Sequence, residues 1–139
     1  MSSDPRTAFA LDASAVLAVM LNEPGHEQVR AISDRAYIHS VNVAEFVGKL
    51  VREGVPRVEA EQMIGELSLG IEQELSIGQA ALCGELMAKT RRQGLSLGDC
   101  VSLAVAAWVG ATAVTADRQW KDLDGLRIDN REIRVQVIR

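Results

Sequence analysis

The stretch LSLGDCVSLAVAAWVGATAVTAD, residues 95–117, decides the fold of this chain. Ser96 followed three residues later by Asp99 is a helix start of the capping-box kind, and Gly110 is a helix stop. Apolar residues cover most of the circumference between them, so this helix is expected to be buried. The β-branched run that follows predicts a buried parallel strand. One carboxylate, that of Asp99, therefore lies at a helix start, and another, that of Asp117, lies just beyond a strand.

Length and composition predict one globular domain spanning residues 1–139, because 47% of the residues are apolar and 24% are charged. The net charge is −4, from 19 acidic and 15 basic residues. This charge excludes the overall basic character of many nucleic-acid-binding proteins, so any RNA contact must come from a local patch or through metal ions. Cys83 and Cys100 lack metal-ligand spacing. Neither a signal pattern nor an apolar run of about 18 residues occurs, so we expect a cytoplasmic protein without a membrane span.

Outside residues 95–117, hydrophobic patterning predicts strands that alternate with helices. Strands are expected at 7–11, 36–39 and 71–75 and in the tail, where Ile133, Val135 and Val137 alternate with polar residues. Helices are expected at 15–21, 26–33, 41–53 with Ser40 as cap, from Pro56 to Gly70, and from Ser76 to Gly94, with one further turn at 118–121. This alternation predicts an α/β domain with a mainly parallel sheet, whose ligands bind outside the carboxyl ends of the strands.

Four acidic residues occupy strand ends or first helical turns. They are Asp12, Glu45, Asp99 and Asp117. If the strands that precede Asp12 and Asp117 are neighbours, the four carboxylates converge. Two carboxylates ~4 Å apart repel by about 4 kcal/mol at an effective dielectric near 20, so such a cluster requires cations, bound protons or basic partners. Oxygen ligands without histidine or thiolate favour Mg²⁺ or Mn²⁺, which activate water and neutralise a scissile phosphate. Ser14 and Thr115 are placed to orient a carboxylate or a metal-bound water.

Each of these residues alone also has an ordinary structural explanation, as a helix cap or a turn residue. His26 and His39 are interpreted as surface or strand residues, and Trp108 as part of the core. Trp120 fits either the core or a contact surface.

The four acids lie in segments that resemble the four acidic motifs of PIN-domain ribonucleases, and VapC-type toxins in particular. The segments are LDAS at 11–14, SVNVAEF at 40–46, LSLGDC at 95–100 and VTADR at 114–118. The resemblance implies a five-stranded parallel sheet flanked by helices and a nuclease that cleaves single-stranded regions of RNA with Mg²⁺ or Mn²⁺. It assigns catalytic and metal-binding roles to the four acids and a supporting hydroxyl role to Thr115.

The same resemblance implies a VapB-type antitoxin, whose C-terminal segment wraps the toxin and reaches toward the active site, and a homodimer. From the apolar residues of the early helices, we expect antitoxin anchors at Val16, Met20, Phe46 and Leu50. Val16, Val19, Met20 and Leu21 are expected to form the dimer surface.

Two other classes of function compete with the nuclease. In the first, the acidic pocket only binds a basic partner peptide. In the second, the chain is another Mg²⁺-using α/β protein, but Ser14 stands where haloacid-dehalogenase phosphatases need a second aspartate, and the pattern of receiver domains is absent. The sequence also lacks a glycine-rich phosphate loop.

Overall fold

A five-stranded parallel sheet organises the molecule. The computed structural model describes residues 8–139, so Thr7 of the expected first strand lies outside the described residues. The strands are β1 (Phe9–Leu11), β2 (Ala36–His39), β3 (Gly70–Glu72), β4 (Thr112–Thr115) and β7 (Val135–Val137), in the order β3-β2-β1-β4-β7. All four pairings are parallel. The predicted parallel α/β fold is confirmed, and the pairing of β1 with β4 meets the condition for bringing the acids that follow these strands together.

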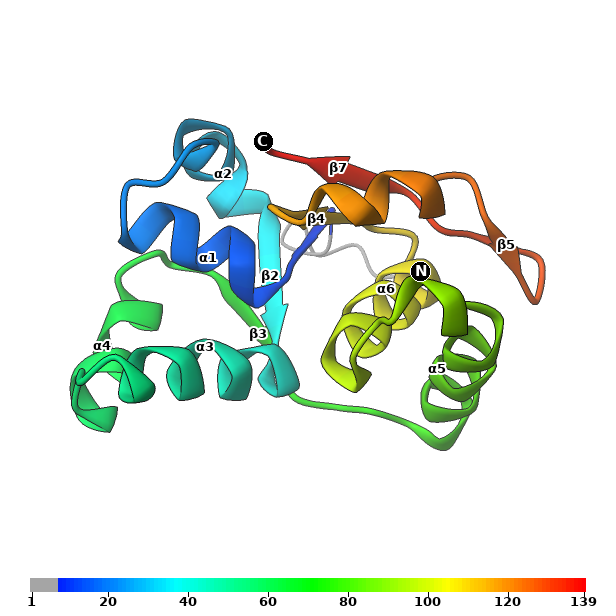
Figure 1. Cartoon of the computed structure of the whole chain (residues 1–139), viewed down its shortest axis with the longest axis horizontal. Helices are drawn as coiled ribbons and strands as arrows, with labels where there is room; N and C mark the ends of the chain where they lie inside the picture. The colour runs from blue at the N-terminus through cyan, green and yellow to red at the C-terminus, as the bar shows by residue number, and fades with distance from the viewer. Residues whose placement is uncertain (1–7) are drawn as a thin grey trace.

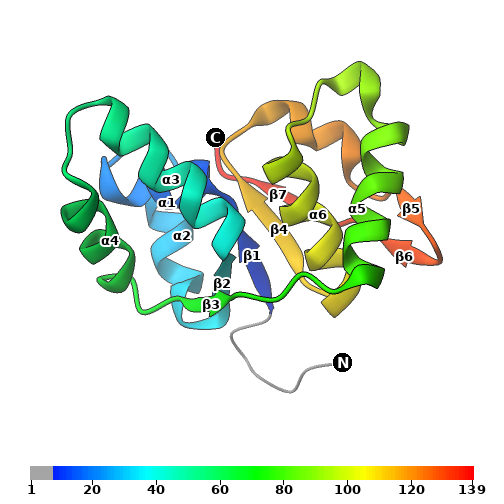
Figure 2. The same ribbon diagram turned by 90° about the horizontal axis from the view of Figure 1, so that it is seen from below.

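Helices cover both faces of the sheet (Figures 1 and 2). One group consists of α1 (Ala13–Met20), α2 (His26–Ile32), α3 (Ser40–Arg52) and α4 (Arg57–Gly65). The other consists of α5 (Ile77–Lys89), α6 (Leu97–Val109) and the 3-10 helix η4 (Arg118–Leu123), and two short 3-10 turns, η2 (Ser33–Arg35) and η3 (Arg91–Gln93), complete the chain. Alternate strand residues face opposite cores: Leu11 and Ile38 pack with the first group, whereas Ala10 and Tyr37 pack with the second.

The stretch at 95–117 folds as predicted. Nine of the thirteen residues of α6 are buried, and Ser96 and Asp99 form a reciprocal capping box. Gly110 ends the helix in the left-handed conformation, at φ 78°, which glycine adopts without steric cost. The chain then enters β4, which lies between β1 and β7.

Several boundaries differ from the sequence prediction. His39, rather than Ser40, caps α3, because its Nδ1 accepts a hydrogen bond from the Val41 amide at 3.1 Å. Helix α4 ends at Gly65 instead of continuing to Gly70. The tail contains an unpredicted two-stranded hairpin of β5 (Arg127–Ile128) and β6 (Arg131–Glu132). It turns through Asp129 and Asn130, both at positive φ, a conformation that these residue types tolerate better than most.

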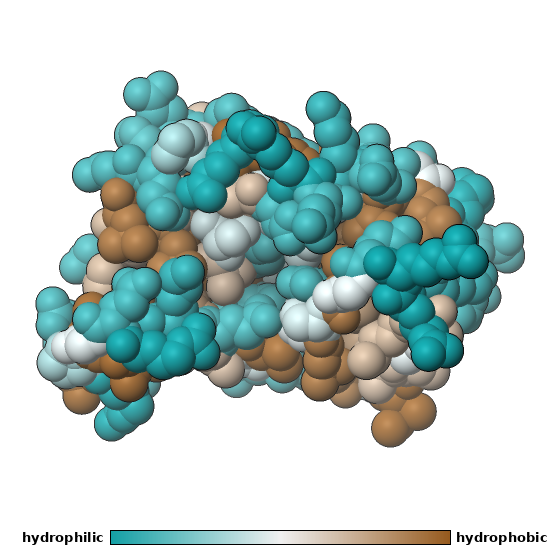
Figure 3. All heavy atoms as spheres, in the orientation of Figure 1, coloured by the Kyte–Doolittle hydropathy of each residue, from teal (hydrophilic) through white to brown (hydrophobic). Residues whose placement is uncertain are grey.

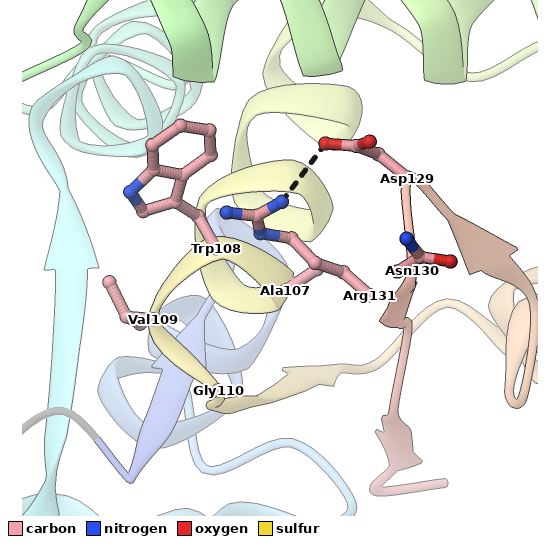
Figure 4. A pocket seen from close by; sticks show the side chains of 7 residues that line it. All are labelled: Ala107, Trp108, Val109, Gly110, Asp129, Asn130 and Arg131. Atoms are coloured by element: carbon pink, nitrogen blue, oxygen red, sulfur yellow. Dashed lines mark hydrogen bonds and ion pairs between the residues drawn. The ribbon is translucent and has the colours of Figure 1, made fainter. Parts of the chain in front are cut away.

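The prediction that Trp108 belongs to the core is wrong, because its side chain is 38% exposed at the carboxyl end of α6. The guanidinium of Arg131 lies 4.3 Å from the centre of a Trp108 ring and pairs with Asp129 at 3.1 Å (Figure 4). These residues line an open cavity of about 580 Å³. By the rise of a helix, this cavity lies roughly 15 Å along α6 from Asp99. Trp120 is fully buried.

The predicted exposure of the early helices also needs correction. Val16, Val19, Phe46 and Leu50 are all at most 1% exposed, because α1 and α3 pack these side chains against the sheet and each other. Of the expected anchors only Met20 reaches the surface, and Leu21 is 44% exposed. No helix within residues 8–139 is long and apolar enough to cross a membrane.

Candidate functional site

The carboxyl ends of the strands lie where four helices begin. Figure 1 shows α1, α3, α6 and η4 starting toward the middle of the molecule, and Figure 3 shows a hollow in the surface there. The strand order reverses between β1 and β4, and parallel α/β sheets bind ligands at such a switch point. Each of the four acids predicted from the sequence stands at or near one of these helix starts.

Asp12 is the most deeply buried of the four, at 5% exposure. It follows β1 and caps α1, because its Oδ1 accepts a hydrogen bond from the Ala15 amide at 2.9 Å. Ser14 donates to the same oxygen at 2.7 Å, and Thr115 donates to Oδ2 at 2.6 Å. Burial raises the pKa of Asp12 to about 6, the negative charge of Asp99 adds to this effect, and the three hydrogen bonds oppose it.

Ser14 and Thr115 join the ends of β1 and β4 around this carboxylate. The Ser14 hydroxyl accepts from the Ala116 amide at 2.9 Å, and the Thr115 hydroxyl accepts from the Asp117 amide at 3.0 Å. Both hydroxyl hydrogens are therefore directed at Asp12, although the two oxygens lie only 3.2 Å apart. The Asp12 carboxylate is thereby held in one orientation.

Asp99 and Asp117 each use one oxygen to cap a helix. Asp99 is half-buried, and its Oδ2 accepts from the Ser96 amide at 2.9 Å. Asp117 is exposed, and its Oδ1 accepts from the Gln119 amide at 2.9 Å at the start of η4. The structure shows no hydrogen bond to the second carboxylate oxygen of either residue within the described part of the chain.

Glu45 reaches from α3 toward α6. Its Oε1 accepts a hydrogen bond from the side-chain Nδ2 of Asn42 at 2.8 Å, and the same Nδ2 donates to the Gly98 carbonyl at 3.1 Å. Gly98 immediately precedes Asp99. Glu45 therefore lies against the first turn of α6, although α3 belongs to the other helical layer.

The structure brings Asp12, Glu45 and Asp99 into one region, with Asp117 following the neighbouring strand. In the conformation described for residues 8–139, no three His, Cys, Asp or Glu side chains form a ready metal-ligand group. Across the same residues, none of the four acids forms an ion pair with lysine or arginine. None of the four carboxylates therefore has a positively charged partner among the described residues.

The donor chemistry of this region fits Mg²⁺ or Mn²⁺, because every candidate ligand is an oxygen. The buried Asp12 carboxylate gains most from a cation, since burial and Asp99 both disfavour its charged form. Asp99 and Asp117 each offer a second oxygen that no other described group engages.

The sequence did not indicate the contacts of two buried residues, His39 and Asn42. His39 ends β2 and joins α3 to the loop before α5, because its Nε2 contacts the Glu74 carbonyl at 2.9 Å. Asn42 lies beside Glu45. Its spacing of three residues from Glu45 places both on one helix face, and this was the available signal. Nothing in the sequence indicated that the partner of His39 lies 35 residues away.

A parallel sheet covered on both faces, with carboxylates at its switch point, defines an α/β domain with an acidic candidate site. The chain belongs to the PIN domain family, whose model matches residues 9–126. No curated protein matches the sequence.

Solved structures show the same fold at low sequence identity. A Salmonella typhimurium VapBC structure bound to DNA matches with a TM-score of 0.70 and 22% identity, covering 94% of this chain and 98% of the other. VapBC2 from Rickettsia felis, bound to a promoter DNA fragment, has a TM-score of 0.68 and 18% identity, with 93% and 97% covered. VapBC-1 from nontypeable Haemophilus influenzae has a TM-score of 0.60 and 15% identity, with 93% and 96% covered.

Proposed function

We propose that this protein is a Mg²⁺- or Mn²⁺-dependent endoribonuclease that cleaves single-stranded regions of RNA and acts as a toxin neutralised by a cognate VapB-type antitoxin. The observation that carries the proposal is the Asp12 carboxylate, which is buried at the switch point, oriented by two hydroxyls and paired with no cation among residues 8–139. Membership of the PIN family and the similarity to VapBC structures support the same conclusion.

In this proposal, Asp12, Glu45, Asp99 and Asp117 hold the cation. When bound, the cation supplies a water of lowered pKa and neutralises charge on the scissile phosphate. Thr115 and Ser14 keep the Asp12 carboxylate oriented and partly offset the cost of its burial. In the same proposal, the remaining oxygens of Asp99 and Asp117 bind the cation from the starts of α6 and η4. The chain thus contributes orientation and negative charge, in a domain that carries a net charge of −4.

Cleavage of RNA tests the enzymatic part directly. We expect the purified protein to cut single-stranded RNA when Mg²⁺ or Mn²⁺ is added, and to lose this activity in excess EDTA because no described residue replaces the cation. The measurement is the accumulation of defined fragments from an end-labelled RNA over time. Cleavage that continues at its full rate in EDTA would contradict a metal-dependent mechanism.

A binding module is the alternative function. It is favoured by one observation, that the side chains within residues 8–139 form no ready group of three metal ligands. An arginine from a partner peptide binds carboxylates through paired hydrogen bonds and would compensate the same negative charge. This alternative predicts peptide binding without RNA cleavage, so the cleavage assay separates the two functions.

An antitoxin would need an apolar surface near the acids. Because Val16, Phe46 and Leu50 are buried, other residues must provide this surface. Met20, Val43 and Val47 are partly buried and pack on the rim of the core formed by α1, α3 and α4. Figure 3 shows hydrophobic residues reaching the surface near the end of α1. We propose that the antitoxin covers this rim and places a basic side chain on the acids, and that the toxin itself is a homodimer.

Expression in the host tests both assemblies. Produced alone, the protein should arrest growth, and produced with the protein encoded by its upstream neighbour it should not. Sedimentation should give the mass of a dimer for the isolated protein at tens of micromolar, and a larger mass for the co-purified complex. A harmless protein with no co-purifying partner would contradict the toxin assignment, and a monomeric mass would contradict the dimer.

A further inference from the structure

Asn42 connects the two helical layers at the candidate site. Its side chain is 1% exposed, and its amide nitrogen donates to Glu45 Oε1 at 2.8 Å and to the Gly98 carbonyl at 3.1 Å. Both partners are acceptors only, so the amide has one orientation that satisfies them. Figures 1 and 2 show the starts of α3 and α6 next to each other at this point. Asn42 therefore ties the Glu45 carboxylate to the backbone of α6.

Gly98 provides the space in which the Glu45 carboxylate lies. A β-carbon built at Gly98 would overlap both Glu45 carboxylate oxygens, whereas one built at Gly48 or Gly84, also within helices, would meet no atom within 4 Å. The absent side chain thus lets Glu45 rest on the first turn of α6, one residue from Asp99. Any side chain at position 98 would push the flexible end of Glu45 away from this place.

The arrangement leaves one polar atom without a partner. The Oδ1 of Asn42 is buried and has no hydrogen-bond partner among the described residues. Buried polar atoms are almost always paired in native proteins, and exceptions often accompany a function or an ordered water. The unpaired Oδ1 can accept a hydrogen bond from water held at the site.

We propose that Asn42 and Gly98 are positioning residues that hold Glu45 next to Asp99, so that Glu45 contributes to cation binding. This inference rests on the proposed function, because it assumes that the acidic site binds Mg²⁺ or Mn²⁺. Without the two residues, Glu45 would be a helix residue free to rotate toward solvent. With them, its carboxylate is directed to the start of α6.

The first test replaces Asn42. We expect Asn42→Ala and Asn42→Asp to weaken Mn²⁺ binding about tenfold or more, as loss of residues that orient metal ligands commonly does. Asn42→Asp is informative because aspartate has nearly the same shape as asparagine. Its carboxylate oxygen would replace the donating Nδ2 and face two other acceptors, Glu45 Oε1 and the Gly98 carbonyl. The readout is the Mn²⁺ Kd obtained from the rise of Tm with Mn²⁺ concentration. Thr90→Val is the matched control, since Thr90 is also buried and donates one hydrogen bond, to the Leu86 carbonyl at 2.7 Å. It should lower Tm without changing Mn²⁺ affinity.

The second test does not depend on a destabilised protein. Gly98→Ala should keep or raise the cation-free Tm, because alanine favours a helix and only the end of a flexible side chain obstructs it. It should nevertheless weaken Mn²⁺ binding, again by about tenfold. Gly48→Ala on α3 and Gly84→Ala on α5 meet no atoms, so they should raise Tm and leave Mn²⁺ affinity at the wild-type value.

The outcomes separate this inference from the proposed function. Weaker Mn²⁺ binding in Asn42→Ala and Gly98→Ala, but not in the three controls, supports the positioning role. Wild-type affinity in Gly98→Ala, together with loss of Mn²⁺ binding in Asp12→Asn, overturns the positioning role and leaves the metal site intact. A wild-type protein whose Tm does not respond to Mn²⁺ overturns both.

Discussion

Asp12→Asn is expected to lower the rate of RNA cleavage by about a thousandfold or more. It is also expected to make the cation-free protein more stable near neutral pH. Cleavage is lost because the amide that replaces the Asp12 carboxylate has no charge with which to hold the cation. Stability is gained because the wild-type carboxylate is buried, with a pKa raised from 3.8 to about 6. The neutral side chain of asparagine has no charge whose burial costs free energy. Its Oδ1 can still accept a hydrogen bond from the backbone amide of Ala15.

The sign of the stability change follows from proton linkage. A carboxyl group whose pKa is higher in the folded state stabilises the fold fully below its unfolded pKa of 3.8, and this stabilisation is lost as the pH rises through about 6. The difference corresponds to about 3 kcal/mol at pH 7 and above. Asp12→Asn does not undergo this loss. Its advantage over the wild type should therefore grow between pH 4 and pH 7.

Urea unfolding of both proteins in EDTA, at several pH values, measures this difference, and the RNA assay measures the activity. Asp122→Asn is a suitable control because Asp122 is exposed. It should leave both the cleavage rate and the pH dependence of stability close to the wild type. Substantial cleavage by Asp12→Asn would remove Asp12 from the catalytic site, and a constant stability difference across pH would show that its burial carries no electrostatic cost.

The sequence predicted the fold wherever local signals and burial agreed. The helix at 97–109 has a capping box, an apolar circumference and a glycine stop, and all three appear in the structure. Patterning failed where tertiary contacts decide. Trp108 looks like a core residue by hydrophobicity. It lies instead at the end of α6, where its ring is covered in part by the Arg131 guanidinium and remains partly exposed. The β5–β6 hairpin has two strands of two residues each, too short to produce an alternating pattern.

The sequence also predicted which end of each element carries an acid, because strand ends and helix starts have recognisable neighbours. It also placed Ser14 and Thr115 close enough to orient a carboxylate, but it could not predict which group holds which carboxylate. Thr115 contacts Asp12 across 103 positions of sequence, and Asn42 contacts Gly98 across 56. Such contacts depend on strand order and helix packing, which no local pattern encodes. The same reason explains the buried anchors: periodicity shows that Phe46 and Leu50 share a face, but not that the sheet and α1 fill it.

Cation binding should depend on pH through Asp12, and Thr115 should determine the pH at which binding fails. Below a pH of about 6 a proton occupies the Asp12 carboxylate and competes with the cation. Mn²⁺ affinity should therefore be nearly constant above pH 7 and fall about tenfold for each pH unit well below 6, as expected for the uptake of one proton. Thr115 opposes this protonation, because its hydroxyl donates to Asp12 Oδ2 at 2.6 Å and stabilises the charged form.

Thr115→Val keeps the shape of the side chain but removes that donor. A hydrogen bond to a charged group contributes about 1.5–3 kcal/mol, so its loss should raise the pKa of Asp12 and move the midpoint of Mn²⁺ binding upward by about one pH unit or more. Thr115→Ser retains the hydroxyl and should restore the wild-type midpoint. Thr112→Val, at the other end of β4, is the matched control for a threonine-to-valine change in this strand. If both Thr115→Val and Thr112→Val have the wild-type midpoint pH of Mn²⁺ binding, the Thr115 hydroxyl does not tune the pKa of Asp12. If the wild-type Mn²⁺ affinity is constant from pH 5 to 8, protonation of Asp12 does not compete with the cation.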